Sequence, residues 1–157
     1  MNSKILVCMV LVSLVSLVFF GCLQSGPKDC KGDLACLQKE AANCNPATLT
    51  YVQSSDSAGY GITSTTYFEI KGKVDGKCTL YAKFEDISVE YPPEVTAEEK
   101  MQAEAIFGMF EGLDGTCTFP SNEALTAVLN SISNEGTTVD WSDAECTGKL
   151  FEIGGVA

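Results

Sequence analysis

The sequence contains no histidine, and none of its ten basic residues is arginine. Without histidine there is no Ser-His-Asp triad, no Cys-His pair, no histidine-ligated zinc and no imidazole general base. Without arginine there is no bidentate fork for a phosphate or a carboxylate. We also find no other catalytic motif, so we predict a protein that is not an enzyme and that uses no cofactor.

Three further patterns are missing. No Cys-x-x-Cys occurs, so zinc ribbons, thioredoxin-like redox sites and ordinary iron–sulfur runs are unsupported. The Asp-x-Asp-x-Asp-Gly calcium loop is absent, and so is any Asn-x-Ser/Thr sequon for N-glycosylation. We therefore expect no metal site, with four irregularly spaced cysteines on zinc as the less favoured alternative to disulfides.

Acidic residues outnumber basic ones by 21 to 10, which gives a formal net charge of −11 at pH 7. The phosphates of DNA, RNA and anionic lipids repel such a protein, so nucleic acid is not an expected partner. The simplest interpretation of this charge is solubility.

The chain begins with Lys4 and a largely apolar, uncharged run from Ile5 to Phe20. Sixteen residues are long for the apolar part of a signal peptide and short for a membrane span, which needs about 20. The run ends in Phe19-Phe20-Gly21-Cys22, which resembles the lipobox of prokaryotic lipoproteins. Gly21 and Cys22 match that pattern, whereas Phe19 and Phe20 stand where the family usually has Leu and Ala or Ser.

The resemblance implies that the Cys22 thiol is diacylated and that cleavage leaves Cys22 as the first residue. It covers the leader alone and implies nothing about the folded domain. An uncleaved membrane anchor and an ordinary secreted protein are the two alternatives. All three place the rest of the chain outside the cytoplasm, because Lys4 stays inside and no later segment is apolar enough to cross back.

These observations predict three parts: a signal peptide or anchor at 1–21, a short tether at 22–29, and a single extracytoplasmic domain at 30–157. We expect the protein at the cell surface, anchored to the outer face of the cytoplasmic membrane or to another envelope membrane. The 136 residues from Cys22 onward are enough for one domain with a real core.

Eight cysteines divide into Cys8 in the leader, Cys22 as the lipidation candidate, and six in the domain. An even number in an exported chain predicts disulfides, and six cysteines allow 15 pairings. From the direction in which the cysteines point in the elements below, we favour three pairs. They are Cys30–Cys36, Cys44–Cys78 and Cys117–Cys146.

Periodicity and turn residues predict an α+β fold, with one antiparallel sheet of four to six strands and two or three helices on one face. The expected helices are Asp33–Asn43, Thr96–Glu111 and one that begins after Ser121 and ends at Asn134-Glu135-Gly136. The expected strands are Ala47–Gln53, Thr63–Lys73, Lys77–Glu90, Gly115–Phe119, Thr137–Trp141 and Cys146–Ile153. Ser54–Gly61 is expected to be a surface loop, Ser142-Asp143-Ala144 a turn, and Gly154–Ala157 a loose tail.

The strongest local pattern is the hairpin around Val74-Asp75-Gly76. A three-residue loop that pairs Lys73 with Lys77 places one apolar set on one face, with Gly72 opposite Cys78, Ile70 opposite Leu80, Phe68 opposite Ala82 and Thr66 opposite Phe84. Cys78 then points inward, toward the same core as Cys44. The other face carries Tyr67, Glu69, Lys71, Tyr81, Lys83 and Glu85.

The helix expected at Thr96–Glu111 begins with a capping box of Thr96 and Glu99. Its wide apolar face contains Met101, Ala105, Ile106, Met109, Phe110 and Leu113, with Phe107 outside the centre. We predict that this face covers the core. The alternative is that its Met and Phe side chains line a site for an apolar ligand or a partner.

Two adjacent acid pairs, Glu85/Asp86 and Glu98/Glu99, are the candidates for carboxylate chemistry. Adjacent side chains diverge on a strand or helix, so a solvated acidic face is the better interpretation. Trp141 is flanked by acids, as in some sugar-binding sites, but we predict a core anchor.

The function expected from the sequence is a membrane-tethered extracytoplasmic lipoprotein that acts as a binding or structural module of the cell envelope. Its expected partners are the membrane, through the N-terminal lipid or anchor, and an envelope protein or an apolar ligand. The alternatives are a small exported carboxylate-dependent enzyme, an enzyme inhibitor, and a carrier of an apolar ligand between the sheet and the helix at Thr96–Glu111.

Overall fold

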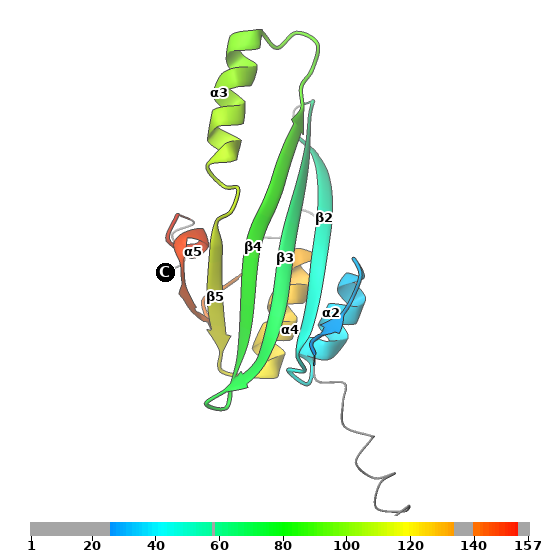
Figure 1. Ribbon diagram of the computed structural model, residues 1–157, viewed down its shortest axis with the longest axis vertical. Coiled ribbons are helices and arrows are strands. Elements are labelled where there is room, and N and C mark those ends of the chain that lie inside the picture. The colour runs from blue at the N-terminus through cyan, green and yellow to red at the C-terminus, as the bar shows by residue number, and fades with distance from the viewer. Residues whose placement is uncertain (1–25, 58, 134–139, 154–157) are drawn as a thin grey trace, which may run out of the picture.

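The computed structural model describes residues 26–57, 59–133 and 140–153. Within these ranges one sheet has six strands in the order β1 to β6, accompanied by four helices (Figure 1). The strands are β1 (Lys28–Asp29), β2 (Ala47–Ser57), β3 (Tyr60–Val74), β4 (Lys77–Glu90), β5 (Asp114–Phe119) and β6 (Glu145–Thr147). The helices are α2 (Leu34–Ala41), α3 (Ala97–Gly108), α4 (Asn122–Ile132) and α5 (Lys149–Ile153). The predicted α+β class is confirmed, and only the short β1 pairs with its neighbour in parallel.

Several predicted features lie outside the described residues. They are the leader 1–21, Cys22 with the tether up to residue 25, the helix end at residues 134–136, most of the strand at 137–141, and the tail 154–157. The last tether residues are described: Lys28 and Asp29 form β1, and the Lys28 ammonium lies 2.6 Å from the Glu40 carboxylate of α2. The sheet therefore includes two residues that the sequence analysis placed in the tether.

Helices α2, α4 and α5 lie on one face of the sheet, where the hydrophobic core forms. Asp33 caps α2 by accepting the Ala35 N–H at 3.0 Å, and Ser121 caps α4 by accepting the Ala124 N–H at 3.2 Å. Fully buried side chains come from both layers: Leu37, Leu49, Ile70, Leu80, Phe119, Leu125 and Leu129. Each contributes about 1.5–3 kcal/mol when removed from water, so this face is the stable base of the domain.

Three disulfides brace this base: Cys30–Cys36, Cys44–Cys78 and Cys117–Cys146. They are the three pairs that the sequence analysis favoured. Cys44–Cys78 joins the end of α2 to the start of β4, and Cys117–Cys146 joins β5 to β6. The predicted disulfide bracing is therefore present in the core itself, since Cys44, Cys78 and Cys117 are all buried.

The hairpin between β3 and β4 has the predicted central register but a different turn. Ile70 pairs with Leu80 and Phe68 with Ala82, as expected, whereas Lys73 pairs with Cys78 across a two-residue turn. The turn residues Asp75 and Gly76 both have positive φ (51° and 80°), as in a type I′ turn. A bulge between Ile70 and Gly72 restores the faces, because one extra residue in β3 replaces the extra residue predicted in the loop.

Two other expectations are wrong. Ser54–Gly61 is mostly strand, because β2 continues to Ser57 and β3 begins at Tyr60, with eleven pairs from Ala47↔Ile70 to Ser57↔Tyr60. Cys146–Ile153 is strand only to Thr147. Gly148 then turns the chain with a φ of 105°, and α5 follows. The sequence pattern alone did not distinguish these structures, because pairing between distant segments decides which of them forms.

Candidate functional site

Helix α3 does not cover the core, so that prediction is wrong. The capping box of Thr96 and Glu99 forms, but none of the residues of α3 is buried. Met101, Ile106 and Met109, from the face expected to pack, are 65%, 54% and 63% exposed. The helix follows the end of β4, beyond the part of the sheet that α2, α4 and α5 cover (Figure 1), so no core is available to its apolar face.

Contacts near both ends of α3 attach it to β4 and its continuation. Near the first turn, the Tyr91 hydroxyl lies 3.5 Å from the Lys100 carbonyl oxygen, and the Lys100 ammonium lies 5.7 Å from the Tyr91 ring centroid. After the last turn, the Gly112 N–H donates to the Phe84 carbonyl at 2.8 Å, and the Phe84 N–H donates to the Leu113 carbonyl at 2.9 Å. The helix is thereby held beside the strand.

Strand β4 extends well past its neighbour β5. The last residue pair between them is Lys83↔Asp114, and the two hydrogen bonds of Phe84 follow. From Asp86 to Glu90, the ladders of the described chain pair β4 with β3 alone. Alternate residues of such an edge direct their N–H and C=O groups outward, where they need another partner or water.

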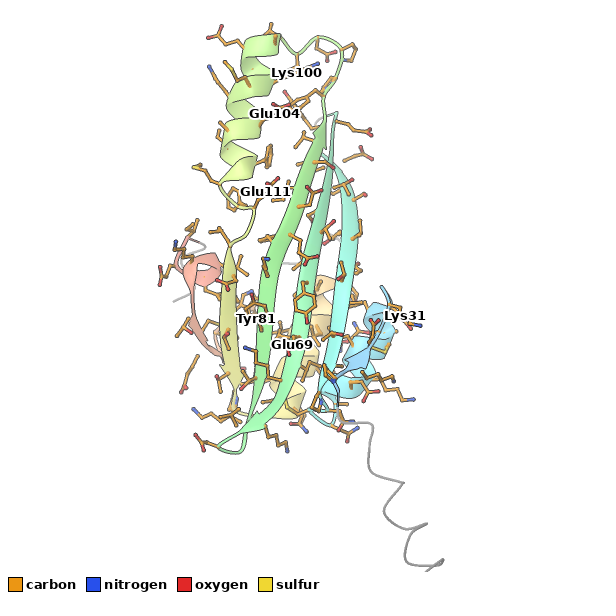
Figure 2. The ribbon with its side chains drawn as sticks, viewed as in Figure 1. Lys31, Glu69, Tyr81, Lys100, Glu104 and Glu111 are labelled. Carbon is orange, nitrogen blue, oxygen red and sulfur yellow. A yellow bond between two sulfur atoms is a disulfide. The ribbon has the colours of Figure 1, made fainter. Side chains whose placement is uncertain are left out.

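Between α3 and this edge lies a groove of ≈ 270 Å³, which we call the α3–β4 groove. Its lining residues come from β4 and its continuation and from α3 and the turn after it: Ile87, Ser88, Val89, Tyr91, Glu104, Phe107, Gly108 and Glu111. Figure 2 shows Lys100 and Glu104 on α3, and Glu111 in the turn after it, beside β4. Phe107 is half-buried in the groove, as are Ile87, Val89 and Tyr91, although it was expected outside the centre of the apolar face.

The α3–β4 groove is acidic. In the described part of the chain, neither Glu104 nor Glu111 forms a salt bridge or a side-chain hydrogen bond. Partial burial and then the nearby negative charge of Glu104 raise the pKa of the Tyr91 phenol, which keeps its proton. The groove therefore combines an apolar floor with two unpaired carboxylates, which suits a cationic rather than a purely apolar ligand.

The opposite side of α3 carries an outer stripe of Met101, Ala105, Ile106 and Met109, all exposed. The apolar-carrier hypothesis expected Met101, Met109, Phe107 or Phe110 to line a pocket between sheet and helix. Of these four, Phe107 alone lines the α3–β4 groove, and half of the eight lining residues are Ser, Glu or Gly. An enclosed apolar site is thus not present at the α3–β4 groove.

The face of the sheet opposite the core is open and polar. Tyr67 and Tyr81 meet edge-on at 6.2 Å, the Lys71 ammonium lies 4.8 Å from the Tyr81 ring centroid, and the Tyr81 hydroxyl donates to Asp114 at 3.0 Å. Partial burial first, and then Asp114, raise the pKa of Tyr81. Figure 2 shows Tyr81 and Glu69 side by side on this face. The Tyr81 ring is already engaged by neighbouring side chains.

The two acid pairs chosen from the sequence do not form a catalytic cluster with each other. Glu99 is used in the capping box, where it accepts the Thr96 N–H at 2.8 Å, and Glu98 is exposed in the same turn. Glu85 and Asp86 lie exposed at a bulge in β4 opposite Thr65 and Thr66.

A different pair of acids comes together on the extended part of the sheet. Asp56 and Glu90 flank Gly61 in register, with carboxylate oxygens 3.7 Å and 3.5 Å from where a Cβ of Gly61 would lie. They border an open hollow of ≈ 690 Å³. The sequence analysis missed them because it placed Asp56 in a loop. A catalytic acid pair needs two environments that separate the pKa values of its members. Both residues are exposed here, so burial does not provide that difference.

Trp141 packs against the core, as predicted. Its ring centroid lies 5.1 Å from that of Phe151 and 6.3 Å from that of Phe119. These ring contacts are typical of a core anchor.

Across the described residues, no three Cys, Asp or Glu side chains lie together as metal ligands. Nor do these ranges include a helix long and apolar enough to span a membrane. No protein-family model, curated protein or solved structure matches the chain.

Proposed function

We propose that this protein is a membrane-tethered extracytoplasmic lipoprotein whose domain acts as a binding module. The observation that carries the proposal is the pairing of all six domain cysteines in disulfides, on a chain whose leader ends in a lipobox-like sequence. Disulfides persist in oxidising compartments, outside the cytoplasm. They support export, and Cys22 supplies the residue for attachment.

The arrangement of the domain supports a binding role for its far end. The chain enters the sheet at Lys28, beside Ala47 at the end where α2 and the β3–β4 turn lie. Helix α3 follows the other end of β4, and a 14-residue strand spans about 45 Å (Figure 1). A lipid on Cys22 would therefore be attached at the end of the domain opposite the α3–β4 groove. The negative charge of the chain also keeps the domain off an anionic bilayer.

The test compares the wild-type chain with Cys22→Ala, and uses Cys8→Ala in the leader as the matched control. We expect wild type and Cys8→Ala in the membrane fraction, resistant to high salt, because two acyl chains give a stable hold. Cys22→Ala should be unacylated. Acylation that persists in Cys22→Ala would contradict the lipid attachment proposed here. Equal membrane retention of all three chains with the leader uncleaved would indicate an anchor, and soluble wild type would indicate secretion.

A further inference from the structure

We propose that the α3–β4 groove binds a short basic segment of a partner protein, in extended conformation, as an added strand on the edge of β4. This inference rests on the proposed function as a binding module and names the partner by its chemistry. Three features of the far end carry it: a strand edge and two carboxylates that are unpaired within the described residues, and a helix that forms a second wall.

The strand edge supplies the main-chain recognition. In the described chain, β4 has no strand neighbour on its outer side after the contacts of Phe84. An extended segment placed there can exchange N–H and C=O bonds with alternate residues of β4. Recognition of this kind between a strand edge and an adjacent helix is a recurrent way to bind peptides.

Helix α3 supplies the second wall and limits the size of the ligand. Contacts through Tyr91 and Phe84 fasten the helix on each side of the groove, so the walls persist without a ligand. Its volume of ≈ 270 Å³ is slightly below the range of about 300–1,000 Å³ for drug-sized ligands, which suits a short segment. Ile87, Val89 and Phe107 give it an apolar floor.

Charge identifies the segment as basic. Glu104 lies in α3 and Glu111 in the turn after it, and both acidic side chains line the α3–β4 groove. Extended chain rises about 3.3 Å per residue, so two Lys or Arg residues on one segment can each approach one of the two carboxylates. The net charge of −11 adds a long-range attraction for a basic partner.

Two other surfaces compete with the α3–β4 groove. Strand β2 also has an edge without a neighbouring strand after the pair Asp29↔Thr48, within the described residues. Helix α2 contacts β2, but the acidic side chains of the α3–β4 groove are not part of that edge. The outer stripe of α3 is apolar and exposed, but no wall stands opposite it. Each alternative predicts a different footprint for the same ligand, so one experiment separates all three.

The test uses the full chain in detergent and a fluorescein-labelled peptide with the core sequence Lys-Val-Thr-Lys. Control peptides are Glu-Val-Thr-Glu and the basic peptide with alternate backbone nitrogens methylated. Fluorescence anisotropy should show binding of the basic peptide and at least tenfold weaker binding of both controls. Hydrogen exchange should slow between Asp86 and Glu90 when the peptide is bound.

Variants then locate the site. Glu104→Gln with Glu111→Gln should weaken binding about two- to thirty-fold, the range for two exposed charge pairs. Gly108→Trp should fill the groove and weaken binding at least tenfold. Gly108 suits this test because nothing lies within 4 Å of its Cβ position. Met101→Gln with Met109→Gln is the control on the outer stripe and should leave affinity unchanged.

Three results would overturn the inference: equal binding of the methylated peptide, protection of Thr50–Asp56 instead of Asp86–Glu90, or loss of binding only in the methionine variant. The acylation state of the wild-type chain, measured beside these assays, separates this inference from the proposed function. Peptide binding by a wild-type chain that carries no acyl group would support the groove and contradict the lipid tether. A lipidated chain that binds no basic peptide would remove the groove alone.

Discussion

The ring of Phe151 in α5 lies directly against Gly115 in β5, where a Cβ would come within 2.4 Å of the Phe151 Cδ2 atom. The same Cβ would lie 2.8 Å from the Thr147 carbonyl oxygen, which belongs to the backbone and cannot move aside freely. Only glycine lets α5 close over β5. This contact places Phe151 beside Trp141 and completes the core at that edge.

Gly115→Ala should therefore destabilise the domain by about 1–3 kcal/mol, the cost of overpacking a filled core. Gly108→Ala in α3 is the matched control, because the new Cβ meets nothing and alanine favours a helix. It should be neutral or stabilising by up to about 1 kcal/mol. Urea denaturation of the two variants checks this. Equal stability of both would show that α5 does not pack on Gly115.

The disulfides should differ in the stability they provide. Cys44–Cys78 and Cys117–Cys146 close segments with sequence separations of 34 and 29, and Cys30–Cys36 one of only 6. Loop-closure entropy predicts losses of about 3–4 kcal/mol for Cys44→Ala with Cys78→Ala, and about 2 kcal/mol for Cys30→Ala with Cys36→Ala. Denaturant midpoints of the paired variants measure the difference. A larger loss for the short loop would contradict the expected order.

The outer stripe of α3 should be dispensable for folding. Met101→Gln with Met109→Gln should change the free energy of unfolding by no more than about 0.5 kcal/mol per site, since both side chains are exposed. Leu129→Ala, in the fully buried part of α4, should cost about 2–5 kcal/mol. Thermal or urea unfolding distinguishes the two. A large loss in the methionine variant would mean that this face packs on the core, as the sequence suggested.

The start of α3 should depend on pH through Glu99. The Thr96 N–H and then the Thr96 hydroxyl lower the pKa of the Glu99 carboxyl below its ordinary value. A lowered pKa in the folded state means that this stabilisation is present above the ordinary carboxyl pKa and is lost as the pH falls through the folded value.

The protection of the first-turn amides of α3, measured against their intrinsic exchange rates at each pH, should therefore fall below that pH, and Glu99→Gln should remove the dependence. Thr96→Val keeps the N–H but loses the hydroxyl, so the pKa of Glu99 should rise only part of the way toward its ordinary value. A side-chain carbon NMR titration of Glu99 gives both values. An unshifted pKa in the wild-type chain would show that the capping box does not form.

The core of the fold could be predicted from the sequence because the local pattern and the long-range pairing agree there. Leu34 and Leu37 share one side of α2, Ile70 and Leu80 can share a face in only one register, and the cysteines follow these directions. The turn at Asp75-Gly76 was predicted wrongly. A two-residue turn with a one-residue bulge in the strand gives the same central pairing as a three-residue loop without a bulge. Counting residues cannot tell these two solutions apart.

Much less of the candidate site could be predicted from the sequence. The sequence shows that α3 is apolar, with a correct capping box, but not whether a sheet face lies beneath it. Phe107 points toward β4 and Met101 away from it because of how the backbone connects around Tyr91 and Gly112. The gap between the ends of β4 and β5 arises from the whole topology. No local sequence pattern therefore predicts this strand edge, and nothing in the sequence distinguishes Glu104 and Glu111 from the other acidic residues.

The most direct test of the tethered-module account is the intact mass of the native protein from the membrane fraction, before and after reduction. The account predicts loss of residues 1–21, added acyl chains on Cys22, and a gain of six hydrogens when the three disulfides are reduced. A chain that keeps its leader and carries no acyl group would contradict lipid attachment. No gain of mass on reduction would contradict the disulfides, and with them the main support for export.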